Sequence, residues 1–282
     1  MKLTVEQTKG RIKRIANENN ADARVLLRLY MMERFLERLS LSKYRNNFII
    51  KGGILVTSLV GVSLRSTMDI DTSMRGQNLN PHTVRKILSE IIEIDAEDGI
   101  TFQIKSFSTI MDEMDYPGVR VTMNAHLDKI DVPLKIDVST DDVITPEAVE
   151  HQYKMMLEDG NIELLSYNLE TVLAEKMQTI LARGALNTRM RDFYDVRILL
   201  QRYMPDINRN DLKKAFKATC CKRGTEKLLG DEAFSVLEFI SSDASLKKQW
   251  FSYSSKYPYA TDVLFEDVIG SLEMLLEMIN KG

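Results

Sequence analysis

Apolar residues follow two different spacings along this chain, and the spacing changes beyond its middle. Over residues 100–107, 118–127 and 133–140, apolar and polar residues alternate, as they do in half-buried β-strands. After about residue 160, apolar residues recur every three or four positions, as they do on the buried face of a helix. The pattern therefore predicts an α+β fold, with a part of mixed helices and strands followed by an all-helical part.

The first part contains further predicted elements besides these three strands. About forty residues at its start have the spacing of a helix. A short apolar run at residues 48–50 is predicted to be a strand that ends at Gly52 and Gly53, after which helical character resumes. A strand candidate follows within residues 63–76, and a helix is predicted at residues 81–95.

The second part is predicted to be helical throughout, with no strand after about residue 160. Its clearest apolar stripe lies near the end and includes Leu264, Leu272 and Ile279. The change of pattern places a domain boundary between residues 165 and 166, so we expect domains at 1–165 and 166–282. The predicted helices of the second domain are 168–183, 189–203, 209–222, 231–242 and 262–280.

Composition limits the classes of protein that these elements can form. The 282 residues include 38 basic and 41 acidic side chains, a formal net charge of −3, which excludes a histone-like nucleic-acid coat but not a local basic cleft. The two cysteines, Cys220 and Cys221, are adjacent, and the three histidines lack ligand spacing, so we expect no disulfide framework and no zinc site. The first twenty residues lack the apolar stretch of a secretory signal, and we expect a cytoplasmic protein without a membrane span.

Two aspartates in the strand candidate at residues 63–76 are the first candidates for chemistry. Asp69 and Asp71 are two residues apart, so on a strand they share one face while Ile70 points to the core. Neighbouring carboxylates repel each other and raise one pKa unless a cation lies between them, and magnesium prefers such oxygen ligands. A solvated edge or turn is the other interpretation of this pair.

Asp137 is a third candidate. Leu134, Ile136 and Val138 take one face of the predicted strand at residues 133–140, which leaves Asp137 on the other face. Carboxylates from neighbouring strands can hold metal ions for phosphoryl chemistry. The alternative is an exposed strand face without a ligand.

Two other features fit the binding of phosphate groups. Gly52 and Gly53, between a strand and a helix, let backbone amides approach phosphate oxygens, although such glycine pairs are often plain turns. Lys176 falls in the middle of the apolar stripe of the helix at 168–183. A lysine there must extend its amine to solvent, bind a carboxylate or face a cleft, so a structural ion pair and a phosphate contact both remain open.

The segment RMRDFYD at residues 189–195 opens the next predicted helix. Asp192 and Asp195 are three residues apart and share a side, with Arg189 and Arg191 beside them, which is also the pattern of an ion-paired helix face. A basic stretch follows on the helix at 209–222, where a solvated face and an RNA-backbone contact are the alternatives. Its residues are Lys213, Lys214, Lys217, Lys222 and Arg223.

In order and spacing, four segments of this chain resemble the motifs of the AbiEii-type nucleotidyltransferase toxins of abortive-infection, type IV toxin–antitoxin systems. The segments are KGGILVTSLVGVSLRSTMDID, LKIDVS, LAEKMQTIL and RMRDFYD, within residues 45–200. The resemblance implies a nucleotidyltransferase-like mixed sheet with flanking helices, followed by a helical domain. It also implies a role in phage defence, with a cognate antitoxin encoded beside the toxin.

The resemblance further implies roles for individual residues. Gly52 and Gly53 would lie at the phosphates of the nucleotide, together with Arg65, Ser66 and Thr67. Magnesium would be held by Asp69, Asp71 and Asp137, the triphosphate would contact Lys176, and Asp192 would be the catalytic aspartate of the last motif. Two departures stand out: the glycine pair replaces the Gly-Ser of many related enzymes, and Arg191 stands where the family pattern has lysine.

We therefore expect a magnesium-dependent nucleotidyltransferase that uses GTP or a pyrimidine triphosphate. Its expected acceptor is RNA, specifically a tRNA 3′ end, with protein nucleotidylation as an alternative. Two other functions fit the same residues. A metal-dependent nuclease would use the carboxylates without a nucleotide, and a non-catalytic nucleotide-binding protein would keep the site without the reaction.

Overall fold

The computed structural model describes residues 3–76, 80–110, 118–140 and 142–281. The chain divides into two compact units. The first comprises residues 1–142 and 149–166, and the second comprises residues 143–148 and 167–282.

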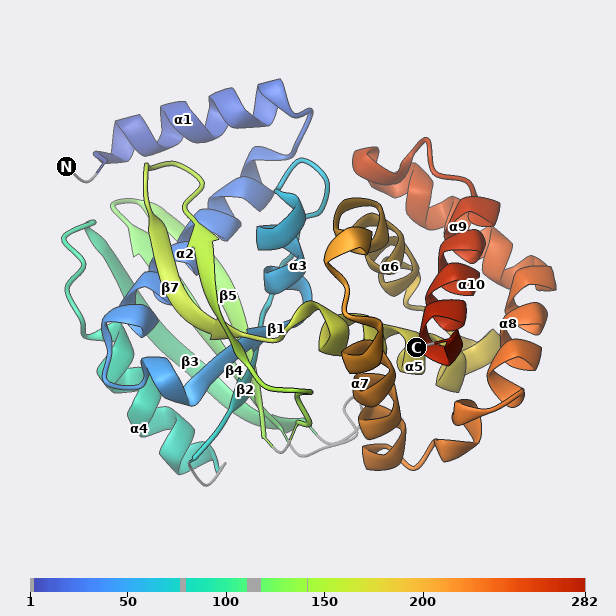
Figure 1. Ribbon diagram of the computed structural model, residues 1–282. Helices are drawn as coiled ribbons and strands as arrows, with labels where there is room; N and C mark the ends of the chain where they lie inside the picture. The colour runs from blue at the N-terminus through green and yellow to red at the C-terminus, as the bar shows by residue number, and fades with distance from the viewer. Residues whose placement is uncertain (1–2, 77–79, 111–117, 141, 282) are drawn as a thin grey trace. The chain divides into compact units, whose positions relative to one another are not determined.

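The first unit is built on a mixed sheet with the strand order β3-β4-β5-β2-β1-β7-β6 (Figure 1). β5 pairs with β2 and β1 pairs with β7 in parallel, whereas the other neighbouring strands are antiparallel. The strands are β1 (Phe48–Lys51), β2 (Ile70–Met74), β3 (Ile100–Ile110), β4 (Gly118–Leu127), β5 (Ile130–Ser139), β6 (Val149–Lys154) and β7 (Asn161–Ser166).

Four helices of the first unit begin where the sequence supplies caps or turns. Thr4 and Gln7 form a capping box at α1 (Val5–Glu18), and the Asn80 side chain caps α4 (Pro81–Ile92). α2 (Ala23–Leu41) contacts β5 and β7, and α4 contacts β3 and α2. α3 (Gly52–Val60) follows β1 directly and contacts β1 and β2, which places its first turn at the end of the central strands (Figure 1).

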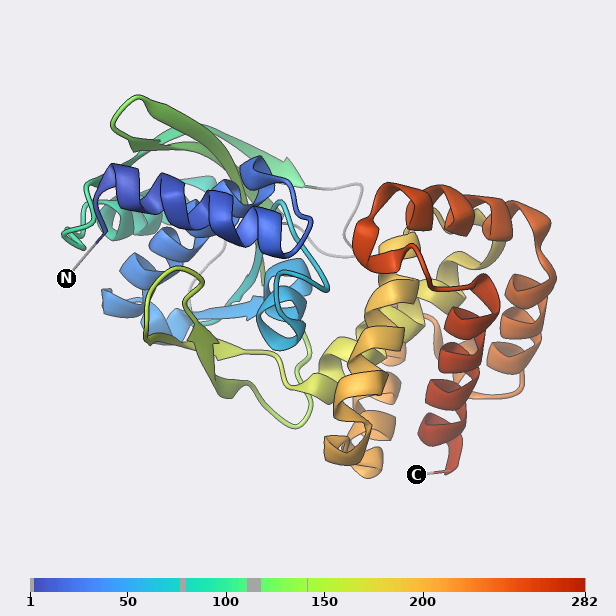
Figure 2. The same cartoon turned by 90° about the horizontal axis from the view of Figure 1, so that it is seen from above.

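The second unit consists of helices (Figure 2). α5 contacts α6 and α7, and α10 contacts α6, α7, α8 and α9, so α10 is packed among the other helices. Apolar residues at helical spacing, such as Leu272, Leu275 and Leu276, are fully buried. The helices are α5 (Leu169–Arg183), α6 (Met190–Tyr203), α7 (Arg209–Lys222), α8 (Glu232–Ser242), α9 (Ala244–Lys256) and α10 (Phe265–Lys281).

The predicted fold class is confirmed, but several details of the prediction are wrong, including the absence of a predicted strand at β6. The helix over the first forty residues is two helices, because Asn20 adopts a left-handed φ of 49° after α1. The strands do not stop at residue 160, since β7 lies at Asn161–Ser166 and pairs with both β1 and β6. α9 was not predicted, because its sequence is mostly polar and buries only Leu246, Trp250 and Ser254.

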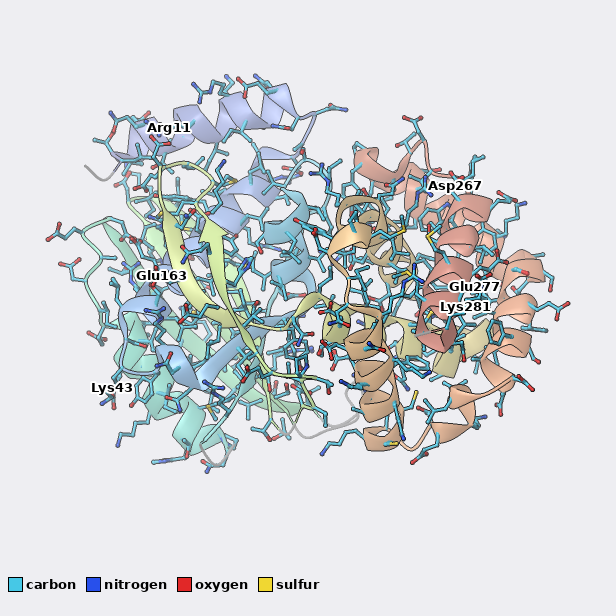
Figure 3. All side chains as sticks on the ribbon, in the orientation of Figure 1. Arg11, Lys43, Glu163, Asp267, Glu277 and Lys281 are labelled. Atoms are coloured by element: carbon cyan, nitrogen blue, oxygen red, sulfur yellow. The ribbon has the colours of Figure 1, made fainter. Side chains whose placement is uncertain are left out.

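Charged side chains such as Arg11, Lys43 and Glu277 are exposed on the outside of the units (Figure 3). Many form local pairs, such as Lys281 with Glu277 one turn before it on α10, at 2.6 Å. Exposed pairs of this kind contribute little to stability, because water and salt screen them. Among the described residues, no helix is long and apolar enough to span a membrane.

Candidate functional site

Four charged side chains form a row across the middle of the sheet. Lys51 of β1 lies opposite Asp71 of β2, Asp71 lies beside Asp137 of β5, and Asp137 lies opposite Arg120 of β4. Residues opposite one another on neighbouring strands project from the same face of a sheet. The sheet therefore presents two adjacent carboxylates with a cation on each side, which we call the charge row.

Asp71 is the carboxylate of the charge row with the least direct compensation. Its Oδ2 accepts a hydrogen bond from the backbone N–H of Gly53, at 3.3 Å. Burial raises the pKa of Asp71, and the negative charges of Asp137 and Asp69 raise it further. Lys51 acts in the opposite direction, but the pKa stays above its ordinary value. A cation placed at this carboxylate would therefore be stabilised by its surroundings.

Lys51 is held away from a direct pair with Asp71. Its Nζ donates to Asp142 Oδ2 at 2.6 Å and to Ser139 Oγ at 2.8 Å. Burial alone would raise the pKa of Asp142, but the charge of Lys51 and the hydrogen bonds from Lys51 and Ser139 hold it below its ordinary value. Lys51 thus neutralises Asp142 through contact and influences Asp71 through space.

The other two predicted metal ligands are each paired with a basic side chain. Arg120 donates from Nε and Nη2 to the two oxygens of Asp137, both at 2.9 Å, which is a bidentate pair. Lys135 Nζ lies 3.1 Å from Asp69 Oδ2, and about a third of each side chain is exposed. Among the described residues, no group of three or more His, Cys, Asp or Glu side chains is arranged to hold a metal ion.

The two predicted phosphate-binding glycines start α3 and pack against the charge row. Gly52 has a φ of +58°, and a Cβ built on it would lie 2.3 Å from Asp71 Oδ2. A Cβ on Gly53 would lie 2.4 Å from Thr67 Oγ1 and 3.1 Å from Arg65 Nη1. The space that a serine side chain would need at position 53 is therefore filled by Thr67, which gives the Gly-Gly departure a steric reason.

The predicted nucleotide contacts before β2 lie beside these glycines. Arg65 and Thr67 are buried, and Arg65 Nη1 donates to the carbonyl of Ser66 at 2.6 Å. Ser66 is half-buried. The structure thus brings Gly52, Gly53, Arg65 and Thr67 together with Asp71 in the first unit.

Lys176 and Asp192 meet in the second unit. Lys176 of α5 donates from Nζ to Asp192 Oδ1 and to Asp195 Oδ2 of α6, both at 2.7 Å. Lys176 and Asp192 are largely buried, and the Asp195 side chain is fully buried. Of the two interpretations left open by the sequence, the structure shows the ion pair, formed with two carboxylates at once. We call these three residues the helix cluster.

The electrostatics of the helix cluster are those of a compensated group. Arg189 Nε donates to Asp192 Oδ2 at 2.8 Å, so each oxygen of Asp192 has a cationic partner. Burial would raise the pKa of Asp192, but the charges and hydrogen bonds of Lys176 and Arg189 outweigh burial and hold the pKa well below its ordinary value.

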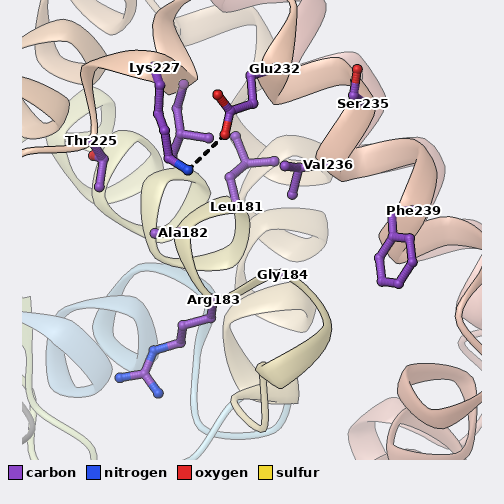
Figure 4. A pocket seen from close by; sticks show the side chains of 11 residues that line it. Leu181, Ala182, Arg183, Gly184, Thr225, Lys227, Glu232, Ser235, Val236 and Phe239 are labelled. Carbon is purple, nitrogen blue, oxygen red and sulfur yellow. Dashed lines mark ion pairs between the residues drawn. The ribbon is translucent and has the colours of Figure 1, made fainter.

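A cavity of about 370 Å³ lies elsewhere in the second unit (Figure 4). It is lined by the end of α5, by the 3₁₀ turn at Glu226–Leu229 and by α8, and the ion pair of Lys227 with Glu232 borders it at 2.8 Å. None of the predicted site residues line this cavity.

On the basic stretch, Lys214 pairs with Asp211, and Arg223 pairs with Glu175. Lys217 is exposed, as on a solvated face.

Sequence reasoning did not assign roles to Lys51, Arg120 or Lys135. Lys51 was visible as a cation at the end of an apolar strand, just before the glycine pair. Arg120 sits between Val119 and Val121 on an alternating strand, so its face was predictable, but its position opposite Asp137 depends on the register of β4 and β5.

Two solved structures share this nucleotidyltransferase-like fold. A candidate nucleotidyltransferase from H. pylori matches with a TM-score of 0.55 at 16% identity, covering 92% of this chain and 96% of that chain. JHP933 from Helicobacter pylori matches with a TM-score of 0.55 at 15% identity, covering 92% and 93%. No curated protein matches the sequence.

The family follows from the sequence match over most of the chain. Residues 34–270 match the model of the nucleotidyl transferase AbiEii toxin family of type IV toxin–antitoxin systems. The chain belongs to this family of nucleotide-transferring toxins. The family resemblance predicted from the four motifs is thereby confirmed.

Proposed function

We propose that this protein transfers a nucleotide from a nucleoside triphosphate to a hydroxyl group of an RNA acceptor, with magnesium, and inhibits growth by doing so. The observation that carries the proposal is Asp71, a carboxylate with a raised pKa held against the first turn of α3 by the N–H of Gly53. Backbone N–H groups at the start of a helix bind phosphate oxygens. The Asp71 carboxylate therefore lies next to a phosphate-binding helix start, and together they fit a metal-bound triphosphate.

The residues of the first unit fit magnesium. Mg²⁺ is commonly bound by one or two carboxylates, with phosphate oxygens and water completing its shell. Asp71 and Asp69 supply carboxylates of this kind, and the raised pKa of Asp71 favours a cation beside it. When bound, the metal would supply positive charge at the triphosphate. Asp137 enters the proposal beside them as the third carboxylate, with its orientation fixed by Arg120.

The proposed reaction needs one proton acceptor from the chain. The acceptor hydroxyl oxygen forms a bond to the α-phosphorus, the bond from the α-phosphorus to the bridging oxygen breaks, and pyrophosphate leaves. Asp137 takes the hydroxyl proton in this proposal, because it lies beside Asp71 in the charge row and a carboxylate is a common general base. Positioning and electrostatics supply most of the acceleration in such transfers.

Lys176 and Asp192 enter the proposal through the family resemblance. The resemblance implies a triphosphate contact for Lys176 and a catalytic role for Asp192. In the structure the amine of Lys176 already donates to Asp192 and Asp195, so its first role is to hold these carboxylates. We propose that Lys176 and Asp192 act on the triphosphate as this preassembled unit. The toxin–antitoxin family also implies a cognate antitoxin, which we propose as the partner that limits toxicity.

The experiment that tests the function supplies each labelled nucleoside triphosphate with magnesium and total cellular RNA, and follows the label. We expect labelled RNA of tRNA size, with GTP or a pyrimidine triphosphate as donor. Asp71→Asn should lower transfer by about a hundredfold or more. Asp131→Asn, an exposed aspartate of β5, is the matched control and should leave transfer unchanged. RNA that shortens without acquiring label would identify a nuclease instead.

Two further measurements separate an active enzyme from a non-catalytic one. Asp69→Ala or Asp71→Ala should abolish growth inhibition at equal protein abundance. Magnesium and a triphosphate together should raise the melting temperature more than the nucleotide alone, since a ligand at a hundredfold excess over its dissociation constant adds about 2.7 kcal/mol of stability. A melting temperature that no triphosphate shifts, with or without metal, would contradict the proposal.

A further inference from the structure

A group of aromatic and basic side chains lies beside the helix cluster in the second unit. Arg191 is the residue next to Asp192 on α6, and its Nη2 donates to the hydroxyl of Tyr257 at 3.1 Å. Its guanidinium carbon lies 5.4 Å from the centre of the Tyr257 ring. We call the group the tyrosine patch; it comprises Arg191, Tyr253, Lys256, Tyr257 and Tyr259.

The rings of the tyrosine patch form a continuous set. The Tyr257 ring centre lies 4.8 Å from that of Tyr253 and 5.4 Å from that of Tyr259, and the planes of Tyr257 and Tyr259 differ by only 22°. The hydroxyls of Tyr253 and Tyr259 lie 3.2 Å apart. All three rings are partly exposed, so aromatic surface of this set is open to a ligand.

Two buried aromatic side chains, Trp250 and Tyr194, support the rings of the tyrosine patch. Trp250 is buried, contacts Tyr253 with ring centres 5.4 Å apart, and donates from Nε1 to the carbonyl of Val263 at 2.9 Å. Tyr194 is also buried, lies 4.9 Å from the Tyr259 ring and donates to the carbonyl of Tyr259 at 3.2 Å. The exposed rings therefore rest on a support whose polar groups are satisfied, which preorganises them for binding.

No acid among the described residues forms an ion pair with the cations of the patch. Lys256 Nζ lies 5.6 Å from the Tyr257 ring, and no carboxylate of a described residue lies within ion-pair distance of Lys256 or Arg191. The nearby acids have other partners, since Asp192 binds Lys176 and Arg189, and Asp267 pairs with Arg197 at 3.6 Å. Positive charge beside stackable rings is the chemistry that binds single-stranded nucleic acid.

We propose that the tyrosine patch binds the single-stranded end of the RNA acceptor. Bases stack on the rings of Tyr257 and Tyr259, and Arg191 and Lys256 neutralise phosphates of the strand. Because every base has a π-face, such a surface accepts a strand without reading its sequence. A duplex is a poor ligand, since its bases are already stacked on one another. The inference rests on the proposed function for the identity of the acceptor.

This assignment gives Arg191 a purpose that lysine would fill less well. A guanidinium is planar and stacks on an aromatic ring while it also donates hydrogen bonds, whereas an ammonium is a compact point charge. Arg191 makes both kinds of contact to Tyr257, a hydrogen bond to its hydroxyl and an approach of the guanidinium to its ring.

The test measures binding of a short, fluorescently labelled single-stranded RNA to the full-length protein by anisotropy, without nucleoside triphosphate. Tyr257→Ala should weaken binding by about tenfold, as expected for loss of one stacked base. Tyr257→Phe should bind nearly as well as the wild type, because it keeps the ring. Phe251→Ala is the matched control, since Phe251 lies on α9, the helix that Tyr257 caps, is 70% exposed and has no ring contact to a described residue of the patch.

Salt dependence tests the basic side chains separately. Arg191→Ala should reduce the slope of log affinity against log salt by about 0.7, the value for one phosphate contact on a single strand. Arg191→Lys should keep the slope while it lowers the affinity. Lys248→Ala, which removes an exposed lysine of α9 outside the patch, should change neither.

Three results would overturn the proposal. These are absence of binding to single-stranded RNA, equal weakening by Phe251→Ala and Tyr257→Ala, and equal binding of duplex and single-stranded RNA. Circular dichroism of each variant shows whether it is folded. If Tyr257→Ala does not fold, Tyr257→Phe and Arg191→Lys still test whether the patch binds RNA. RNA that binds through the patch but acquires no label would contradict the proposed function alone. Label transfer with unchanged binding by Tyr257→Ala and Arg191→Ala would contradict the patch alone.

Discussion

The charge row of the first unit and the helix cluster of the second unit both combine lysine or arginine with paired aspartates, yet they are compensated differently. In the helix cluster, Lys176 contacts both Asp192 and Asp195, and the pKa of Asp192 is lowered. In the charge row, Lys51 contacts Asp142 instead of Asp71, and the pKa of Asp71 is raised. The carboxylates of the helix cluster are compensated by its own cations, whereas the charge row has a carboxylate, Asp71, that a further cation would stabilise.

This difference separates stability from function within one molecule. A buried ion pair destabilises strongly when one partner is removed, because the other charge remains buried and unpaired. A carboxylate with a raised pKa already destabilises the fold when ionised, and such groups concentrate at functional sites. The helix cluster should therefore respond to mutation through folding, and the charge row through ligand binding and activity.

The largest expected effect on stability is that of Lys176→Met. Methionine keeps much of the apolar stem but leaves Asp195, which is fully buried, without its lysine partner. We expect the free energy of unfolding to fall by about 3–5 kcal/mol, measured by denaturant titration. Lys217→Met, at an exposed lysine of α7, is the control and should change stability by less than about 0.5 kcal/mol. A stable Lys176→Met variant that no longer binds nucleotide would show that the lysine serves the triphosphate alone.

Gly52→Ala comes next and tests the packing of the charge row. Its φ of +58° strains any residue with a Cβ, and that Cβ would lie 2.3 Å from Asp71 Oδ2. Gly99→Ala is the matched control in the same unit, since Gly99 has a φ of +70° with nothing near its Cβ position. Gly52→Ala should cost about 1–3 kcal/mol more than Gly99→Ala and should also lower nucleotide transfer. Equal costs would show that Asp71 moves freely away from position 52.

Asp71→Asn should have a smaller effect on stability, with the opposite sign to Lys176→Met. Asparagine keeps an oxygen to accept the Gly53 N–H and removes a charge that Asp137 and Asp69 repel. The free energy of unfolding should stay constant or rise by about 1 kcal/mol, although transfer is lost. A marked loss of stability in Asp71→Asn would mean that Asp71 is a structural ion-pair partner like Asp192.

The smallest effect is the pH dependence of stability, which should have opposite signs for Asp71 of the charge row and Asp192 of the helix cluster. The raised pKa of Asp71 means that the unfolded chain loses this proton first, so the contribution of Asp71 to stability falls as pH rises above about 3.9. The lowered pKa of Asp192 means that its contribution is present above about 3.9 and is lost as pH falls further.

Unfolding free energies of the wild type, Asp71→Asn and Asp192→Asn, measured from acid to neutral pH, check both signs. The stability of Asp71→Asn relative to the wild type should increase as pH rises from about 4. The deficit of Asp192→Asn should shrink as pH falls below about 4. If the free energies of unfolding of the two variants changed in parallel with pH, the charge row and the helix cluster would not differ in the way we expect.

Most elements of the fold were predictable because their burial pattern is local. Val119, Val121 and Met123 alternate on β4 and are buried as predicted, and the apolar stripe of α10 is likewise buried. β6 was missed because most of its residues are exposed, and α9 because few of its residues face the core. In each case tertiary packing, more than local spacing, selects the element.

The local pattern of residues is enough to show which charges lie at the end of a buried strand or within an apolar stripe, and the four motifs indicated the family. The partners of these charged residues follow from the tertiary structure: Arg120 for Asp137, Asp142 for Lys51, and Tyr257 for Arg191. The physical reason is that alternation and helical period follow from neighbouring residues, whereas register and helix packing join segments far apart in the chain. Whether a buried aspartate is compensated depends on those distant partners, so the sequence could name Asp71 and Asp192 but could not tell their environments apart.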